Sequence, residues 1–247
     1  MAALPSPTRN WHDATYPSLS PTRPELSAKH KTVLITGGGT GIGAETARYF
    51  TAAGASRIAV LGRREQPLLD TKASIETQFP NVDVFTAPTD VTNQSEVDAA
   101  FAHFLGDGQE LDVLVSGAAV IGPLEPLRDV DPKRFLDALQ ANVKGTLFVA
   151  QAFLRHAAAN AVVVEINSSA AHVNFIPGFT SYSAAKLTVY RIWDSLAFEN
   201  QDLSVFHIHP GVVDTDMNRE AGVSKATGIE DHGGWHAGYR FLCGILS

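Results

Sequence analysis

Apolar runs of strand length alternate with helix-length amphipathic segments along most of this chain, and this alternation restricts the fold more than any other sequence feature. The strand-like runs span residues 32–36, 57–61, 82–87, 111–116, 161–167 and 203–209, and the helical patterns span 41–53, 64–78, 93–105, 131–158 and 181–200. Several of the runs are nearly continuous Val, Ile and Leu, which is typical of parallel strands covered on both faces. The six alternations predict an α/β fold with a doubly wound parallel sheet in a single domain.

Composition and charge exclude several classes of function. A length of 247 residues suits one domain, and the net charge of −7 disfavours nucleic acid as a partner, because phosphate binding needs a concentrated basic surface. No apolar stretch approaches the roughly 20 residues that span a bilayer, and the N-terminus has no apolar signal-peptide core. The single cysteine, Cys243, excludes an intrachain disulfide. We therefore expect a cytoplasmic protein without a membrane span.

A glycine-rich turn follows directly on the first strand-like run. Residues 36–43 read Thr-Gly-Gly-Gly-Thr-Gly-Ile-Gly and lead into the first helical pattern. Glycines allow a tight turn and let backbone N–H groups approach a pyrophosphate at a helix N-terminus. A plain structural turn is the alternative, but the position between the first strand and the first helix favours a dinucleotide site in a Rossmann-like fold.

The spacing T-G-x-x-x-G-x-G resembles that of the short-chain dehydrogenase/reductase family, and further motifs extend the resemblance over about residues 31–220. Where the family usually has Asn-Asn-Ala-Gly, this chain has Ser-Gly-Ala-Ala at 116–119. Family members contact the adenine ring just after the third strand and the nicotinamide end in the segment matching 210–215. The resemblance implies cofactor contacts at Gly37, Gly41, Ile42, Gly43, Asp90, Ala118, Val213 and Thr215.

The candidate proton-transfer residues lie on the fifth strand and the helix after it. Tyr182 and Lys186 are spaced i, i+4, so both face one side of a helix, although a surface Tyr/Lys pair is the alternative. Ser169 stands 13 residues before Tyr182, the spacing of the family's serine, and this spacing excludes Ser168. The resemblance implies that Tyr182 is the general acid, that Ser169 holds the substrate oxygen, and that Asn142 helps hold a water in a proton relay. A free phenol has a pKa of about 10, and the Lys186 ammonium would lower it; Lys186 and Tyr182 are also implied cofactor contacts.

The end of the second strand-like run indicates which dinucleotide binds. Relatives specific for NAD usually carry an acidic residue here to accept from the ribose 2′-OH. This chain has Gly62 followed by Arg63, whose guanidinium suits a 2′-phosphate, although a merely solvated arginine is the alternative. Thr40 stands where many NADP enzymes have a second basic residue. We predict NADP(H) as the cofactor, with NAD possible.

Two segments are expected to wall the substrate site, residues 171–181 and the loop after Thr215. The first contains Val173, Phe175, Ile176, Pro177 and Phe179 and no fixed charge. It therefore predicts an apolar carbonyl or secondary alcohol as the small-molecule substrate. A resemblance to short-chain reductases of filamentous fungi implies secondary metabolism. The alternatives are a non-catalytic dinucleotide-binding sensor or interaction protein, and a dehydratase or epimerase on the same fold.

The two ends of the chain depart from this pattern. Residues 1–30 carry prolines at 5, 7, 17, 21 and 24 and are expected to form an irregular arm before the dinucleotide-binding catalytic domain at 31–220. Residues 221–247 hold six glycines, so we expect a substrate-loop remnant and a missing or vestigial seventh strand. His232 and His236 have a metal-like interval, but the glycines between them disfavour a site, so no metal is expected. A homo-oligomer would assemble through the helices at 131–158 and 181–200.

Overall fold

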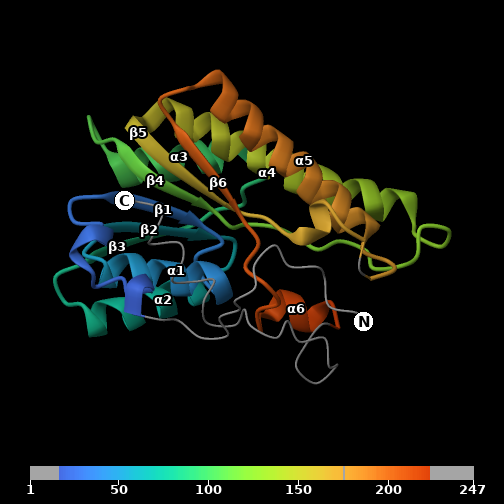
Figure 1. Cartoon of the computed structure of the whole chain (residues 1–247), viewed down its shortest axis with the longest axis horizontal. Coiled ribbons are helices and arrows are strands. Elements are labelled where there is room, and N and C mark those ends of the chain that lie inside the picture. Colours follow the sequence, from blue (N-terminus) through green and yellow to red (C-terminus); the bar gives the residue numbers. More distant parts are fainter. Residues whose placement is uncertain (1–16, 175, 223–247) are drawn as a thin grey trace.

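Six parallel strands form one sheet in this computed structural model, which describes residues 17–174 and 176–222 (Figure 1). The sheet order is β3-β2-β1-β4-β5-β6. The strands are β1 (Thr32–Thr36), β2 (Arg57–Gly62), β3 (Asp83–Pro88), β4 (Leu111–Ser116), β5 (Ala157–Ile166) and β6 (Ser204–Ile208). The predicted doubly wound parallel sheet is confirmed, and it belongs to a single Rossmann-like α/β domain.

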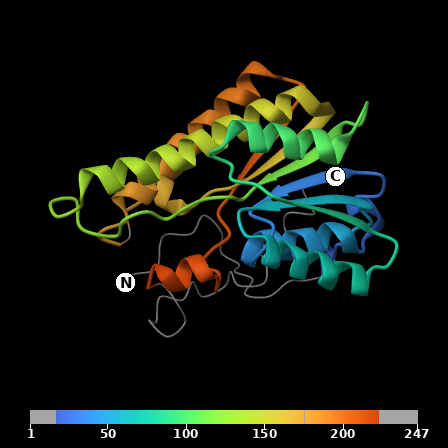
Figure 2. The same ribbon diagram turned by 180° about the vertical axis from the view of Figure 1, so that it is seen from behind.

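Helices cover both faces of the sheet, as Figures 1 and 2 show from opposite sides. The helices are α1 (Gly41–Ala52), α2 (Glu65–Gln78), α3 (Gln94–Leu105), α4 (Pro132–His156), α5 (Thr180–Glu199) and the short α6 (Asp216–Glu220). Along β1, Val33 and Ile35 pack with α1 and α2, whereas Leu34 packs with α3, α4 and α5. Alternate residues of a strand point to opposite faces, so a strand flanked by helices on both sides needs apolar residues throughout.

Local sequence signals account for where the long helix α4 begins. The Asp131 side chain accepts a hydrogen bond from the backbone N–H of Arg134, and Pro132 occupies the first turn, where its missing N–H costs nothing. The helix ends at His156, because the chain enters β5 directly at Ala157, four residues before the expected start of that strand. Residues 157–160 read Ala-Ala-Ala-Asn, which has low strand propensity, and the pairing with β4 shifts register beside them.

The segment before β1 is partly built into the core. Residues 17–30 form two single-turn 3-10 helices, Pro17–Leu19 and Pro24–Leu26. The side chains of Leu26 and Ala28 are buried, and the Ala28 N–H donates to the Ala53 carbonyl. No helix among the described residues is long and apolar enough to cross a membrane. The expected absence of a seventh strand and the His232/His236 interval fall on residues 223–247, outside the described part of the chain.

The sheet order fixes where a ligand can sit. From β1 the chain proceeds outward to β2 and β3, and it then returns to β4 on the other side of β1. The loops that leave β1 and β4 therefore diverge to opposite faces and leave a crevice at the carboxyl ends of these strands. Both the glycine-rich turn and the loop at 117–122 begin at this point.

Candidate active site

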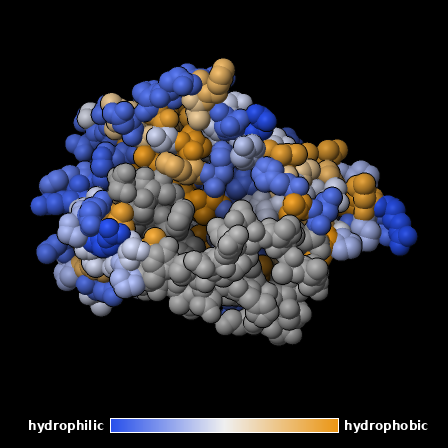
Figure 3. Space-filling view, in the orientation of Figure 1, coloured by the Kyte–Doolittle hydropathy of each residue, from blue (hydrophilic) through white to orange (hydrophobic). Residues whose placement is uncertain are grey.

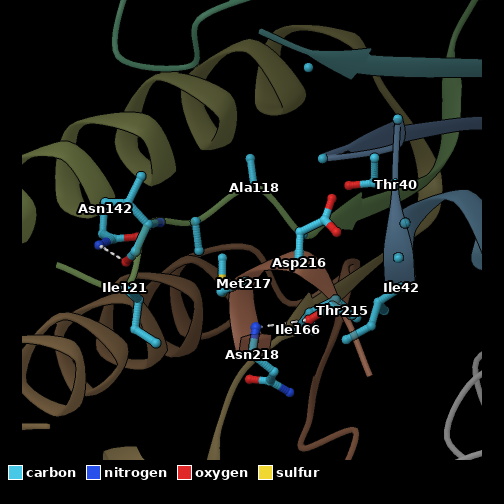
Figure 4. Close-up of a pocket in the computed structure, with 18 of the residues that line it drawn as sticks. Thr40, Ile42, Ala118, Ile121, Asn142, Ile166, Thr215, Asp216, Met217 and Asn218 are labelled. Carbon is cyan, nitrogen blue, oxygen red and sulfur yellow. Dashed lines mark hydrogen bonds between the residues drawn. The ribbon is translucent and has the colours of Figure 1, made fainter. Parts of the chain in front are cut away.

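A cavity of about 820 Å³ opens at this crevice. Its walls come from the glycine-rich turn, the ends of β2 and β3, the loop at 117–122, α4, α5 and the segment 209–220. Figure 4 shows Thr40 and Ile42 at one side of it, Asn142 and Ile121 at the other, and Asp216 and Met217 of α6 between them. The volume lies in the range of sites that hold a cofactor or a small molecule.

The glycine-rich turn has a shape that larger residues cannot adopt. Gly37 and Gly41 have φ values of +74° and +53°, in the left-handed region. At Gly43 an added Cβ would lie 2.2 Å from the Gly37 carbonyl oxygen, so α1 packs directly on the turn. The N–H groups of Gly37 and Gly38 donate to the Leu61 carbonyl at 2.8 and 3.0 Å, which ties the turn to β2.

This turn suits a phosphate group. Gly37, Gly41, Ile42 and Gly43, the four residues of this turn that were predicted to contact the cofactor, all line the cavity. The first turn of α1 carries no acidic residue, so its unpaired N–H groups and the helix dipole present positive charge to the cavity. The residues present therefore fit the pyrophosphate of a dinucleotide.

The predicted adenosine-side residues lie together at the ends of β2 and β3. Arg63 and Asp90 both line the cavity, and Arg63 is exposed. Within the described residues Arg63 forms no ion pair, whereas Arg64 lies 3.9 Å from the Asp216 carboxylate of α6. The Asp90 carboxylate accepts from the backbone N–H and the hydroxyl of Thr92 at 2.9 and 2.8 Å. These hydrogen bonds, the backbone one first, lower the pKa of Asp90 and fix its carboxylate as an acceptor.

The departure at residues 116–119 is compensated by a threonine. The Thr36 hydroxyl at the end of β1 accepts from the N–H groups of Gly117 and Ala118 at 3.1 and 3.2 Å. Ala118 lines the cavity, as predicted. A side chain of the neighbouring strand thus braces this loop, which lacks the family's asparagines.

Asn142 lies beside the same loop, and its side-chain amide is fully hydrogen-bonded within the protein. Its amide nitrogen donates to the carbonyls of Val120 and Ala138, both at 2.9 Å, and its oxygen accepts from the Val120 N–H at 3.1 Å. Both amide hydrogens are therefore used. The side chain joins the loop to α4, and the predicted relay role stays a prediction that these bonds do not support.

Tyr182 and Lys186 meet at the inner end of the cavity, as their spacing predicted. Both line it, with the Lys186 Nζ 5.9 Å from the centre of the Tyr182 ring. Burial raises the pKa of Tyr182 to about 12; a hydrogen bond with the Ser168 hydroxyl lowers it, and the Glu165 carboxylate raises it further. Burial lowers the pKa of Lys186, while Glu165 opposes that change. The expected lowering of the Tyr182 pKa by Lys186 is therefore wrong for this structure, because burial outweighs the other effects and Lys186 is not among the groups that lower that pKa.

Of the two adjacent serines, the structure brings Ser168 rather than the predicted Ser169 to the cavity wall. Ser168 lines the cavity, and its hydroxyl acts to lower the pKa of Tyr182, whereas Ser169 begins the 3-10 helix η3 (Ser169–Ala171) and is not among the lining residues. Ser168 has an extended backbone, with φ −151° and ψ 145°, and caps η3 through the Ala170 N–H. Neighbouring side chains of an extended segment point in opposite directions, so a 13-residue spacing cannot settle which serine faces the tyrosine.

The segment after β6 also differs from expectation in detail. Thr215 lines the cavity, but Val213 is buried outside it, and Val212 takes the place in the wall. The Val213 carbonyl accepts from the Asn218 side chain, which folds α6 back toward the site (Figure 4).

Part of the cavity wall is apolar, and its residues come from several elements. Ile121, Ile166, Phe179 and Met217 all line it. Of the residues expected from 171–181, Phe179 reaches this wall. Val173, Ile176 and Pro177 line a separate hollow of about 370 Å³, and Phe175 lies outside the described residues.

Sequence reasoning missed a buried polar cluster beneath Lys186. Glu165, Asn167 and His207 lie at the ends of β5 and β6, and Glu165 is 1% exposed. The signal was a glutamate inside the apolar run AVVVEIN, next to the candidate serine. A charged residue in a strand buried on both faces needs a partner, which the sequence does not name. No group of three His, Cys, Asp or Glu side chains in the described part of the chain is arranged to hold a metal ion.

Comparisons with known proteins agree with this geometry. A family model described as short chain dehydrogenase matches residues 31–225. A short chain dehydrogenase/reductase of Claviceps purpurea is 30% identical over 217 residues, which cover 86% of this chain and 72% of that protein. A solved short-chain type dehydrogenase/reductase from Mycobacterium ulcerans superposes with a TM-score of 0.77 at 26% identity, covering 89% of this chain and 82% of its own. A short chain dehydrogenase from Shigella flexneri complexed with NADP gives 0.75 at 23% identity, with 90% and 93% covered.

Proposed function

Because this chain belongs to the short-chain dehydrogenase/reductase family, and is thereby an oxidoreductase of CH–OH and C=O groups, we propose that it interconverts an apolar ketone and a secondary alcohol with NADP(H). The observation that carries the proposal is the convergence of Tyr182, Lys186 and Ser168 at one end of a cavity whose other end is the glycine-rich turn. A proton donor and a phosphate-binding turn therefore share one cavity.

In the reducing direction, Tyr182 donates its hydroxyl proton to the substrate oxygen as negative charge develops there. The raised pKa keeps this phenol protonated, and the Ser168 hydroxyl holds the same substrate oxygen by a hydrogen bond. The Lys186 ammonium stabilises the phenolate that remains after proton transfer. A bound nicotinamide supplies or accepts the hydride.

Charge at the adenosine end supports NADP(H) over NAD. Arg63 is an exposed guanidinium at the end of β2, without an ion-pair partner among the described residues, and it lines the cavity beside the Gly62 position. A guanidinium binds a phosphate by charge-assisted, often paired hydrogen bonds, whereas Gly62 has no side chain that could accept a hydrogen bond from a ribose 2′-OH. Binding of NADP by the related Shigella flexneri structure is consistent with this proposal.

Four apolar residues of the cavity wall support an uncharged, apolar substrate. Ile121, Ile166, Phe179 and Met217 offer no charge to pair with a phosphate or carboxylate on the substrate. An apolar ketone reduced in secondary metabolism fits this wall and the resemblance to fungal relatives such as the Claviceps purpurea protein.

Self-association through α4 and α5 is part of the proposal. Leu136, Leu147 and Leu154 lie on one face of α4 and are 58%, 42% and 42% exposed, and Leu187 of α5 is 49% exposed. Figure 3 shows hydrophobic side chains gathered over the α5 side of the molecule. Exposed leucines in a row on a helix favour packing against another subunit.

The test is cofactor oxidation by the purified full chain across a panel of uncharged ketones and quinones, with NADPH and NADH in parallel. We expect NADPH-dependent reduction of at least one apolar ketone. In Tyr182→Phe, which loses the proton donor but keeps the ring, we expect kcat to fall by roughly 100-fold or more. Cofactor binding should be nearly unchanged in that variant. Tight binding of NADPH with no turnover of any carbonyl would favour a non-catalytic sensor and contradict the proposal.

A further inference from the structure

A carboxylate is buried directly behind the proposed proton donor. Glu165 is 1% exposed on β5, and its Oε2 accepts from the Asn167 amide at 2.6 Å. The same Oε2 lies 3.0 Å from Nδ1 of His207 on β6. Burying a carboxylate in this way is costly unless hydrogen bonds and an opposite charge compensate. One oxygen is therefore fixed by two neighbours.

The other oxygen faces the lysine. Glu165 Oε1 is buried without a hydrogen-bond partner in the described residues, and the Lys186 Nζ lies 3.7 Å from it. The Lys186 side chain is 8% exposed, and its Nζ donates to the Ile166 carbonyl. A buried ammonium tends to lose its proton unless an anion lies nearby. Each group thus supplies the charge that the other lacks.

We propose that Glu165 is a positioning residue that keeps Lys186 protonated and aimed at Tyr182, with Asn167 and His207 holding its carboxylate in place. The inference rests on the proposed function, because Lys186 matters to the reaction through Tyr182. A lysine that had lost its proton could not stabilise the phenolate, so the counter-charge of Glu165 is required for the proton transfer.

The ionisable groups that face Glu165 come from two elements. Lys186 and Tyr182 belong to α5, and His207 belongs to β6. The Tyr190 ring of α5 lies tilted against His207, with 4.3 Å between ring centres, and the His172 ring meets Tyr190 edge-on at 5.2 Å. The carboxylate by itself opposes ionisation of Tyr182. Glu165 can therefore favour the phenolate only through Lys186. The direct effect of its charge on Tyr182 and the effect through Lys186 have opposite signs, so an experiment can tell them apart.

The first experiment measures the charge of Lys186 without any turnover. The full chain is labelled with ¹³C at the lysine Cε, and Lys186 is assigned among the seven lysines by its absence in Lys186→Met. In the parent we expect a protonated Lys186 at neutral pH. Glu165→Gln keeps the shape of the side chain and removes its charge. In this variant the Lys186 Cε signal should reach the chemical shift of a neutral lysine at a lower pH than in the parent. The control is Glu199→Gln, which makes the same change at an exposed carboxylate at the end of α5. It should leave the Lys186 titration unchanged.

Two results of this first experiment would overturn the proposal, and one of them needs no Glu165 variant. A neutral Lys186 in the parent at neutral pH is the first, and it applies even where Glu165→Gln does not fold. The second is a Lys186 titration that is unchanged in folded Glu165→Gln. Because both are read by NMR in the absence of substrate, neither depends on whether the protein reduces a ketone.

The second experiment separates a charge effect from a structural one. On a ketone found active, Glu165→Gln should lower kcat roughly tenfold or more, while the KM for NADPH stays within about twofold, since one unit of displaced titration is a factor of ten. In the alcohol-oxidising direction its pH profile should move to higher pH, because the phenolate has lost its cation. Glu165→Asp keeps the charge and should restore most of kcat. A profile displaced to lower pH would mean that Glu165 acts on Tyr182 by its own charge alone, which would overturn the proposal.

Discussion

Gly43 offers a sharp test of how the glycine-rich turn is built. In Gly43→Ala the new Cβ would lie 2.2 Å from the Gly37 carbonyl oxygen, 2.8 Å from the Gly37 carbonyl carbon and 3.0 Å from the Gly38 Cα. All three are backbone atoms, so no side chain can rotate away. To restore a contact of 3.0 Å, the carbonyl oxygen and the helix must separate by about 0.8 Å.

Two opposing effects set the size of the stability change. Replacing a helical glycine by alanine gains up to about 1 kcal/mol, because the unfolded chain loses conformational freedom. Overpacking against fixed backbone costs about 1–3 kcal/mol. A contact of 2.2 Å with fixed backbone belongs at the upper end of that range, about 2–3 kcal/mol. We therefore expect a net loss of about 1–2 kcal/mol, or roughly 2–8 °C in Tm for a domain of this size.

Cofactor binding should suffer more than stability. The separation moves the N–H groups of the turn relative to the N-terminus of α1, which together would hold the pyrophosphate. Loss of one charge-assisted hydrogen bond is worth about 1.5–3 kcal/mol, which corresponds to a Kd for NADPH raised roughly 10- to 150-fold.

The assay is fluorescence titration with NADPH, paired with thermal melting of the same samples. Gly62→Ala is the matched control, because Gly62 also lines the cavity while its added Cβ would meet only Leu68 Cδ2, at 3.5 Å. We expect Gly62→Ala to melt within about 1 °C of the parent. A Gly43→Ala protein with the parent's Kd and Tm would refute the close packing of α1 on the turn.

Three further outcomes follow from the site. Arg63→Ala should weaken NADPH binding by about 1.5–3 kcal/mol with little change for NADH, as titration with both cofactors would show; equal losses would exclude a 2′-phosphate contact. Ser168→Ala should lower kcat roughly 10- to 100-fold while Ser169→Ala stays near the parent, and the reverse order would restore the serine expected from spacing. Because burial raises the pKa of Tyr182 to about 12, ketone reduction should change little from about pH 6 to pH 8. Alcohol oxidation, which needs the phenolate, should rise with pH over the same range and above it, and a flat oxidation profile would count against Tyr182 as the base.

The sequence by itself determined the fold and many of the residues that line the cavity. Strands buried on both faces need continuous apolar residues, so β1, β2 and β4 were recognisable from composition and length. The turn at Gly37–Gly43 was recognisable because left-handed φ values and close helix packing tolerate little but glycine. Tyr182 and Lys186 were brought together by helical periodicity alone. Each of these features depends on residues that are near one another along the chain.

What only the tertiary structure decided depends on residues far apart in the chain. Ser168 rather than Ser169 faces Tyr182 because the backbone is extended where β5 meets η3. The number of residues between a serine and the tyrosine does not reveal this backbone conformation. Besides Asn167, the partners of Glu165 are Lys186 of α5 and His207 of β6, which lie 21 and 42 residues away along the chain. A buried charge shows in the sequence only as an exception to an apolar pattern. The group that neutralises it is chosen by the packing of neighbouring elements, because electrostatic compensation depends on distance in space.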